Sequence, residues 1–230
     1  MIKDNNLQVV KVGASSIIDN GKVKKNILDS IAYDLNRFLD GGIHSVLVVS
    51  GAIKLGMEEL NYKKQPANDD IATLTRCAGV GQPLLIENYR KALKKYDITS
   101  SQLLITYHNL NDTEEEKNIE RKIKDDLNND IVTLINYNDC IDSEGLALYD
   151  KNKKLRIRDN DMLASTIAKY INAFRIVMLT NSRSNGTVGG SITKKAAISL
   201  AKKNNIEIII GEYNIGLYKI CKKTKIIKIR

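Results

Sequence analysis

The sequence predicts an α/β protein, a three-layer α/β/α sandwich with a mainly parallel central sheet. Two observations lead to this prediction. Short runs rich in Val, Ile and Leu recur along the 230 residues, and most are followed by a longer stretch whose apolar residues repeat with the period of a helix. Strands that are apolar almost throughout must be buried on both faces, which is typical of parallel sheets covered by helices on each side.

The first strand is expected at 8–12 and the first helix at 26–39, where apolar residues recur on one face and two glycines follow the last turn. A second strand follows at 43–49. The same alternation continues through the rest of the chain. It predicts further strands at 102–105, 131–135, 176–179 and 206–210, and helices at 71–95, 114–127, 161–170 and 192–203.

Two features interrupt the alternation. Pro83 lies inside an otherwise helical pattern and predicts a kink or a break in that helix. Residues 141–158 are polar and rich in turn formers, so we expect a hairpin or flap at the surface. Because neither a repeat nor a linker divides the chain, residues 1–230 are expected to form a single domain.

The composition disfavours several classes of protein. The longest apolar runs are far shorter than the roughly 20 residues that a membrane-spanning helix needs, and the first residues lack the apolar segment of a secretory signal, so a cytoplasmic protein is expected. Cys77, Cys140 and Cys221 form no C-x-x-C pair and are expected to be small buried residues. With only two histidines, a metal site formed by the protein is not expected.

The net charge of +9 raises the question of nucleic-acid binding, because clustered lysines and arginines bind phosphate backbones. Here the lysines are spread along the chain, aromatic residues make up only 5%, and no recognition motif accompanies the charge. Nucleic acid is therefore not the expected partner. The lysine-rich segment 219–230 is the one place where such a role stays open.

Small, polar or charged residues follow several of the predicted strands. Segments 11–15, 50–53 and 136–139 occupy these positions, and segments 159–161 and 186–194 each lead into a helix. In open parallel sheets, ligands bind beyond the carboxyl ends of the strands. Glycines at such turns let backbone N–H groups approach an anion, and a helix N-terminus adds partial positive charge. Phosphate is the expected ligand, although the sequence contains neither a Walker A motif nor a dinucleotide-binding glycine pattern.

Lys11 is the most informative charged residue, because a lysine at the end of a buried strand needs a compensating anion. Two unit charges ~4 Å apart interact by about 4 kcal/mol at an effective dielectric constant of ~20. The alternative is that the ammonium group reaches past the strand edge to water. Phosphoryl transfer requires cations around the transferred group. Lys11 and Lys194 could supply them, with Asp161 between them holding both ammonium groups.

Five segments together resemble the amino acid kinase family, and within it the glutamate 5-kinase branch. They occur in the same order as in the family. The resemblance extends from near residue 8 to near residue 211 and so covers most of the chain. The stretches V-S-G-A-I-K-L-G at 49–56 and V-G-Q-P-L-L at 80–85 are specific to that branch. The remaining segments are 9–16, 136–139 and 159–161.

The resemblance implies transfer of the γ-phosphoryl group of ATP to the γ-carboxylate of L-glutamate, with Mg²⁺ carried in on ATP. The product would be γ-glutamyl phosphate, the first intermediate towards proline, which a reductase would consume. The resemblance also implies that Lys11 and Lys194 stabilise the transferred phosphoryl group and that Asp161 organises them. The residues implied to bind the amino acid are Ser50, Gly51, Ala52, Asn136, Asp139 and Asn160. Those implied to face the nucleotide are Lys11, Gly13, Thr180, Asn181, Val188, Gly189, Gly190, Ser191, Ile192, Thr193 and Lys194.

The chain departs from the family pattern mainly on the nucleotide side. Asn181 stands where the family has Asp in a Thr-Asp pair, and the segment between that pair and the glycine loop is cut to 182–185. Tyr137 replaces an acidic residue, and Arg158 replaces a small one. The family's closing Gly-Thr-x-Phe element and the RNA-binding-like domain of the branch are absent, so a shortened form is expected.

These departures leave two alternatives to a glutamate kinase. One is a degenerate kinase fold with weakened nucleotide binding that acts as a regulatory or binding subunit. The other is a different carboxylate or phosphate kinase of the same fold. In addition, a homo-oligomer is expected.

Overall fold

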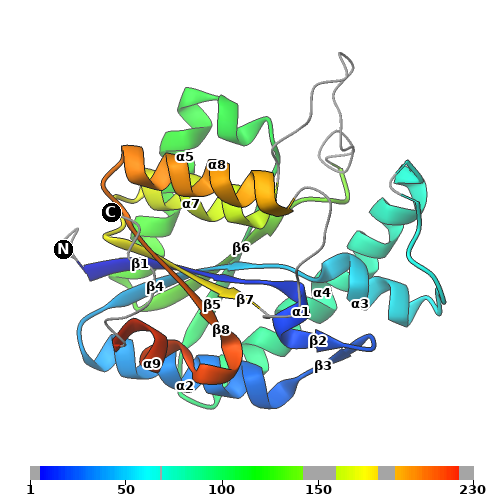
Figure 1. The fold of residues 1–230 in the computed structure, drawn as a ribbon, viewed down its shortest axis with the longest axis horizontal. Coiled ribbons are helices and arrows are strands. Elements are labelled where there is room, and N and C mark those ends of the chain that lie inside the picture. The colour runs from blue at the N-terminus through cyan, green and yellow to red at the C-terminus, as the bar shows by residue number, and fades with distance from the viewer. Residues whose placement is uncertain (1–5, 68, 142–158, 181–189, 223–230) are drawn as a thin grey trace.

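In the computed structural model of the chain, the described residues are 6–67, 69–141, 159–180 and 190–222, with only the backbone described at 190–193. They contain a six-stranded sheet with the order β5-β6-β4-β1-β7-β8 (Figure 1). Every pair of neighbouring strands in this sheet is parallel. The strands are β1 Leu7–Val12, β4 His44–Val49, β5 Thr99–Ile105, β6 Ile131–Tyr137, β7 Arg175–Thr180 and β8 Glu207–Glu212.

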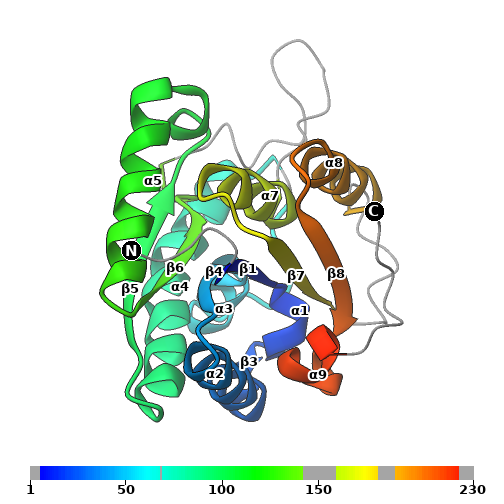
Figure 2. The same ribbon diagram turned by 90° about the vertical axis from the view of Figure 1, so that its left-hand side faces the viewer.

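Helices cover both faces of this sheet (Figures 1 and 2). The core on one face includes Ile123, Ile167 and Ala197 from α5, α7 and α8. The core on the other face includes Leu35 and Leu85 from α2 and α4. The predicted three-layer α/β/α fold is therefore confirmed. The helices are α1 Ala14–Ile17, α2 Lys25–Asp40, α3 Ala52–Glu59, α4 Ile71–Lys94, α5 Thr113–Asn128, α7 Asn160–Tyr170, α8 Gly190–Lys203 and α9 Leu217–Lys222, with 3₁₀ turns η2 Asn109–Asn111 and η3 Tyr213–Ile215.

The predicted elements all occur, but several short ones were missed. β5 begins at Thr99 rather than at residue 102, because its first three residues pair with β6 despite their polar side chains. Helices α1, α3 and α9 were not predicted, since a run of four to eight residues shows too few turns for a helical period. The small antiparallel pair β2 Ile18–Asp19 and β3 Lys22–Val23 was also missed. Most of the predicted flap, 142–158, lies outside the described residues.

Pro83 neither ends nor interrupts α4, so the predicted break is wrong. A proline removes one backbone hydrogen bond of a helix, yet α4 continues through Pro83 to Lys94 and packs closely against α3. A Cβ added to Gly81 would lie 1.8 Å from the carbonyl oxygen of Ala52, and a Cβ added to Gly56 would lie 1.8 Å from that of Cys77. The two helices therefore meet backbone to backbone at two positions that only glycine can occupy.

The cysteines are free thiols with different exposures. Cys77 is buried and Cys221 is half-buried, but Cys140 is exposed. The expectation of burial is therefore wrong for Cys140, which comes after the end of β6, where the chain has left the core. No helix among the described residues is long and apolar enough to cross a bilayer.

Asp126 is a buried carboxylate in α5 that hydrogen bonds hold in its ionised form. It accepts a hydrogen bond from Thr133 Oγ1 at 2.9 Å, and others from Ser101 Oγ and Lys122 Nζ. Burial works to raise its pKa, but the hydrogen bonds and the charge of Lys122 outweigh it and hold the pKa below its usual value. We expect Asp126→Asn to lower the free energy of unfolding at pH 7 by about 1–3 kcal/mol.

This loss should depend on pH. Because folding lowers the pKa, the ionised carboxylate stabilises the protein above the pKa of the unfolded chain, about 4, and this contribution is lost as the pH falls through the lower pKa of the folded chain. In urea unfolding, the difference between Asp126→Asn and the wild type should shrink from pH 7 to pH 3. The exposed Asp125 provides a control, since Asp125→Asn should change little at either pH. Equal destabilisation by Asp126→Asn at both pH values would contradict a role for the ionised form.

Candidate active site

The residues implied to bind an amino acid lie together at the carboxyl edge of the sheet. This is the edge where β1 leads into α1 and β4 leads towards α3 (Figure 1). A cavity of about 340 Å³ opens there, within the size range of small-molecule sites. The residues implied for the amino acid all line it, namely Ser50, Gly51, Ala52, Asn136, Asp139 and Asn160.

Beside this cavity, Lys11 and Asp161 form a largely buried ion pair. Lys11 Nζ lies 2.7 Å from Asp161 Oδ1, and the two side chains are 17% and 6% exposed. The two atoms form an ion pair but are not aligned as a hydrogen bond, because the buried Asp161 Oδ1 has no hydrogen-bond partner among the described residues. Burying two charges is costly unless each compensates the other. The structure therefore supplies the anion that Lys11 requires from within the chain.

The start of α7 places Asp161 opposite Lys11. Asp159 caps this helix, because its Oδ1 accepts hydrogen bonds from the backbone N–H of Asp161 at 2.8 Å and of Met162 at 3.1 Å. The carboxylate of Asp161 then lies in the first turn of α7, where the helix dipole favours negative charge. The D-N-D sequence at 159–161 thus begins a helix and at the same time positions one half of the ion pair.

A chain of side-chain amides connects the cavity wall to Gln82 on the buried face of helix α4. Asn160 Nδ2 donates to the carbonyl oxygen of Val49 at 2.7 Å and to Asn136 Oδ1 at 3.2 Å. Asn136 Nδ2 in turn donates to Gln82 Oε1 at 2.9 Å. Asn136 and Gln82 are only 4% and 6% exposed. The amides at the cavity are therefore held by hydrogen bonds within the protein before any ligand binds.

Two glycines shape the floor of the site in different ways. A Cβ added to Gly13 would lie 3.7 Å from Lys11 Nζ, so glycine leaves room beside the ammonium group. The N–H of Gly13 already donates to the carbonyl of Leu179 at 3.4 Å, so this glycine offers space rather than a free donor. Gly51 has φ of 126°, which side-chain-bearing residues rarely adopt. A Cβ there would also lie 2.5 Å from Ile18 Cδ1.

Lys194 lies at the same edge of the sheet but does not complete the predicted clamp. Helices α7 and α8 pack together, with Ser165 Oγ donating to the carbonyl of Ala197 at 3.0 Å. Each helix precedes a parallel strand, so both start at the carboxyl edge. Lys194 and Asp161 therefore both lie about one turn before this contact. Among the described residues, Lys194 forms no ion pair with Asp161, and Asp161 holds Lys11 alone.

The rest of the predicted nucleotide side is described only in part. Thr180 ends β7 and is half-buried. Gly190, Ser191, Ile192 and Thr193 form the first turn of α8, of which the backbone alone is described. The predicted residues Asn181, Val188 and Gly189 lie outside the described residues.

The cavity also contains residues that sequence reasoning did not assign to it. Lys54 and Met57 extend from α3, whereas Tyr137 and Asp159 belong to the polar segments 136–139 and 159–161. Ile53 and Met57 both line the wall with a spacing of four, which is the signal of a helix that starts right after Gly51. Gln65 and Leu74 come from the segment before α4 and from α4 itself, and no sequence pattern connects them to this site.

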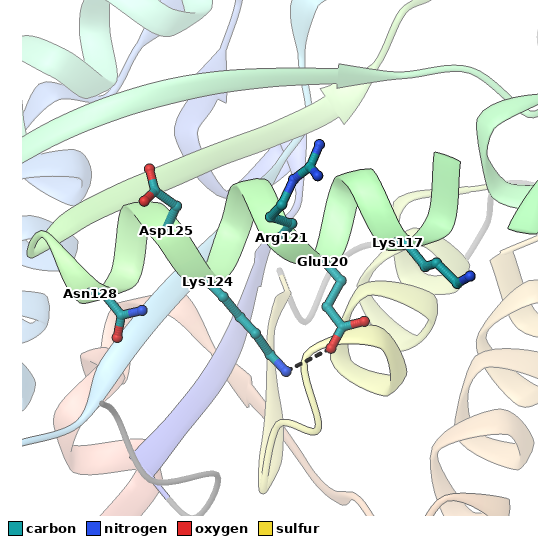
Figure 3. A pocket seen from close by; sticks show the side chains of 6 residues that line it. All are labelled: Lys117, Glu120, Arg121, Lys124, Asp125 and Asn128. Carbon is teal, nitrogen blue, oxygen red and sulfur yellow. Dashed lines mark hydrogen bonds and ion pairs between the residues drawn. The ribbon is translucent and has the colours of Figure 1, made fainter. Parts of the chain in front are cut away.

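A second hollow lies on α5, far from this chemistry. Figure 3 shows its lining, which comes entirely from one exposed helix. Lys124 Nζ is already paired with Glu120 Oε1 at 2.6 Å. Because positive and negative side chains are interspersed along a single helix without a second wall, this hollow is a solvated helix surface.

Comparison with known sequences identifies a family and several relatives. A profile of the amino acid kinase family matches residues 6–184. A glutamate 5-kinase from Thermoanaerobacter sp. (strain X514) is 31% identical over 213 residues, covering 92% of this chain and 52% of the relative. Another from Nitrosomonas eutropha is 30% identical and covers 96% of this chain and 58% of the relative. The chain thus spans about half the length of the curated relatives it matches.

Solved structures share the fold at much lower sequence identity. Giardia carbamate kinase superimposes with a TM-score of 0.58 at 12% identity, covering 92% of this chain and 94% of that structure. An isopentenyl phosphate kinase superimposes with a TM-score of 0.60 at 13% identity, covering 94% and 95%. These likenesses concern the fold alone. Since the family profile covers well over half of the sequence and the observed sheet and helices agree with it, this chain belongs to the amino acid kinase family.

Proposed function

We propose that this protein transfers the γ-phosphoryl group of ATP to the γ-carboxylate of L-glutamate. The observation that carries the proposal is the buried pair of Lys11 and Asp161 directly beside a cavity lined by Ser50, Asp139 and Asn160. A cation for the phosphoryl group and a polar pocket for a small amino acid are thereby adjacent. The glutamate 5-kinases related to this chain at about 30% identity support the choice of substrate.

In the proposed reaction, a γ-carboxylate oxygen attacks the γ-phosphorus, the bond from that phosphorus to the β,γ-bridging oxygen breaks, and ADP leaves. Negative charge spreads over the equatorial oxygens of the transferred group. Lys11 would stabilise this charge, and Asp161 would hold its ammonium group in place. Gly13 leaves space for a phosphate oxygen next to Lys11 Nζ. The acyl phosphate product is labile, so a reductase that consumes it is the expected next enzyme. We also propose a homo-oligomer as the active form.

Mg²⁺ would reach this site as the complex with ATP. Among the described residues, no group of three His, Cys, Asp or Glu side chains could hold a metal ion, and the carboxylate of Asp161 is already occupied by Lys11. The phosphates would therefore provide most of the ligands. Bound there, the ion would neutralise charge on the β- and γ-phosphates.

The proposal is tested by incubating the purified protein with ATP, Mg²⁺, L-glutamate and hydroxylamine. An acyl phosphate reacts with hydroxylamine to a coloured hydroxamate, and we expect its formation to require both ATP and glutamate. Aspartate, carbamate and nucleoside monophosphates, assayed in parallel by ADP release, test the other kinases of this fold. Turnover of one of these in place of glutamate would overturn the choice of substrate and leave the class of reaction standing.

We further predict that Asp139→Ala weakens glutamate binding more than ATP binding. Asp139 lines the cavity near Asn136 and supplies negative charge where a substrate ammonium group would lie. Loss of one charge-assisted hydrogen bond should raise the KM for glutamate roughly 10-fold or more, and titration with each substrate measures this. Asp130→Ala, at an exposed position beyond α5, serves as the control. An equal rise in KM for both substrates would contradict the proposed role.

The alternative of a regulatory or binding subunit is favoured by one feature, the short segment 182–185 on the nucleotide side. A subunit of this kind would bind glutamate without turning it over. Isothermal titration with glutamate and with ATP, run beside the hydroxamate assay, distinguishes the two. Glutamate binding with neither ATP binding nor turnover would favour the subunit.

A further inference from the structure

The hydrogen bonds that link the three amides beside the cavity can run from donor to acceptor in only one direction. The reason is that the bond at one end is made to a group that can only accept. The carbonyl oxygen of Val49 has no hydrogen to donate, so the atom of Asn160 that lies 2.7 Å from it must be the NH₂ group. The same NH₂ group uses its second hydrogen for Asn136 Oδ1 at 3.2 Å. Both hydrogens of Asn160 Nδ2 are then engaged within the protein.

The hydrogen bonds continue from Asn160 through Asn136 to Gln82 on the buried face of α4. Since Asn136 Oδ1 accepts, its Nδ2 points the other way and donates to Gln82 Oε1 at 2.9 Å. The orientation of Gln82 follows in turn, with Nε2 at the far end. Among the described residues, this buried Nε2 has no hydrogen-bond partner. Gln82 thus receives a hydrogen bond at one end of the chain, and its own donor lies away from Asn136.

From this arrangement we infer that Gln82 is a positioning residue, which holds Asn136 Oδ1 towards Asn160 so that both hydrogens of Asn160 Nδ2 are engaged and its Oδ1 is left for the bound amino acid. The inference rests on the proposed function of the cavity. With both Nδ2 hydrogens engaged, Asn160 retains Oδ1 for a ligand. An acceptor selects a donor on the substrate, such as the α-ammonium group, and disfavours a carboxylate at that position.

Gln82 matters because Asn136 has an alternative orientation that would break the chain. If Asn136 turned by half a rotation, its NH₂ group would face the NH₂ group of Asn160, and two donors would oppose each other. In the observed orientation Asn136 Nδ2 also donates to Gln82 Oε1, so turning Asn136 would cost this second hydrogen bond as well unless Gln82 turned with it. Gln82 is 6% exposed and does not line the cavity of about 340 Å³, so it acts through Asn136 and Asn160.

Two substitutions at position 82 separate hydrogen bonding from packing. Gln82→Met keeps the length of the side chain but removes the amide oxygen, and Gln82→Glu keeps an oxygen acceptor. We expect Gln82→Met to raise the KM for glutamate roughly 3- to 10-fold, as the loss of one buried hydrogen bond does, with little change in the KM for ATP. Gln82→Glu should recover most of this loss. Selectivity for glutamate over glutarate, which lacks the ammonium group, should fall in Gln82→Met.

A double substitution gives a sharper test. In Asn136→Asp the new carboxylate still accepts from Asn160, and Gln82 can turn its NH₂ group towards it, so a modest effect is expected. Combined with Gln82→Glu, two carboxyl groups would face each other. The double variant should therefore lose more glutamate affinity than the product of the two single losses. If the loss in the double variant equals the product of the two single losses, the proposed direction of the hydrogen bonds is overturned. Equal effects of Met and Glu at position 82 would overturn it as well.

A readout without substrate keeps this test independent of the proposed function. In the ligand-free protein, side-chain amide NMR signals of Asn136 and Asn160 should exchange slowly with water, and in Gln82→Met those of Asn136 should exchange faster. The exposed Gln102 offers a matched control in Gln102→Met. Unchanged exchange in Gln82→Met would overturn the inference even if glutamate is turned over. Faster exchange in a protein that ignores glutamate would retain the chain and reject the substrate.

Discussion

Replacing Lys11 with alanine should lower kcat about 100-fold or more, as loss of a preorganised donor to the transition state usually does. Lys11 Nζ is held 2.7 Å from Asp161 Oδ1 beside the open space at Gly13. No reorganisation is then needed when charge develops on the transferred phosphoryl group. The measurement is kcat in the hydroxamate assay at saturating ATP and glutamate.

Two further variants separate this catalytic effect from loss of structure. Lys11→Ala leaves the buried carboxylate of Asp161 without its cation, which is itself destabilising. Circular dichroism must therefore show a folded protein at the assay temperature, and adding Asp161→Asn should restore stability without restoring kcat. Lys95→Ala breaks an exposed ion pair with Asp29, of 2.6 Å, and should leave kcat unchanged. Near-normal turnover by folded Lys11→Ala would remove this lysine from the mechanism.

Gly81→Ala should destabilise the protein by about 3 kcal/mol or more, because overpacking against a backbone has few ways to relax. The added Cβ would lie 1.8 Å from the carbonyl oxygen of Ala52 and 2.5 Å from the backbone nitrogen of Gly56. To make room, α3 must move away from α4. For a chain of this size, such a loss lowers Tm by roughly 6–12 °C, which thermal unfolding measures.

The displacement of α3 should also reach the cavity, since Ala52 and Ile53 line it. We therefore expect a raised KM for glutamate in any Gly81→Ala protein that folds. Gly79→Ala, two residues earlier in α4, is the matched control. Its Cβ would meet only Cys140 Sγ at 3.5 Å, an ordinary contact, and alanine favours a helix by up to about 1 kcal/mol over glycine. Equal losses of Tm for both variants would show that close packing of α3 is not the cause.

The sequence was sufficient to predict the layers of the fold and the ion pair at its edge. Apolar strands alternating with amphipathic helices require a covered parallel sheet, and parallel strands bring their following loops to one edge. Lys11 and Asp161 are far apart in the chain, yet each lies next to an element that was predicted correctly, so their proximity followed from the topology.

Contacts that depend on atomic detail could not be predicted in this way. The sequence carries no signal of a contact between Gly56 and Gly81, and only the structure shows that the two helix backbones touch there. The partnership of Gln82 with Asn136 depends on side-chain rotamers across α4 and β6, which no periodicity encodes. Whether Lys194 pairs with Asp161 depends on side-chain orientations at the starts of α7 and α8, which a sequence-based helix boundary does not define.

The group that orients the site amides belongs to the main chain of β4. Mutation at position 49 can change the Val side chain but leaves its peptide oxygen in place. The orientation of the Asn160 amide therefore depends on the backbone of β4, and no substitution of the side chain at position 49 reverses it. Replacing the amide bond after Val49 by an ester, which weakens that oxygen as an acceptor, is the chemical change that would reach it.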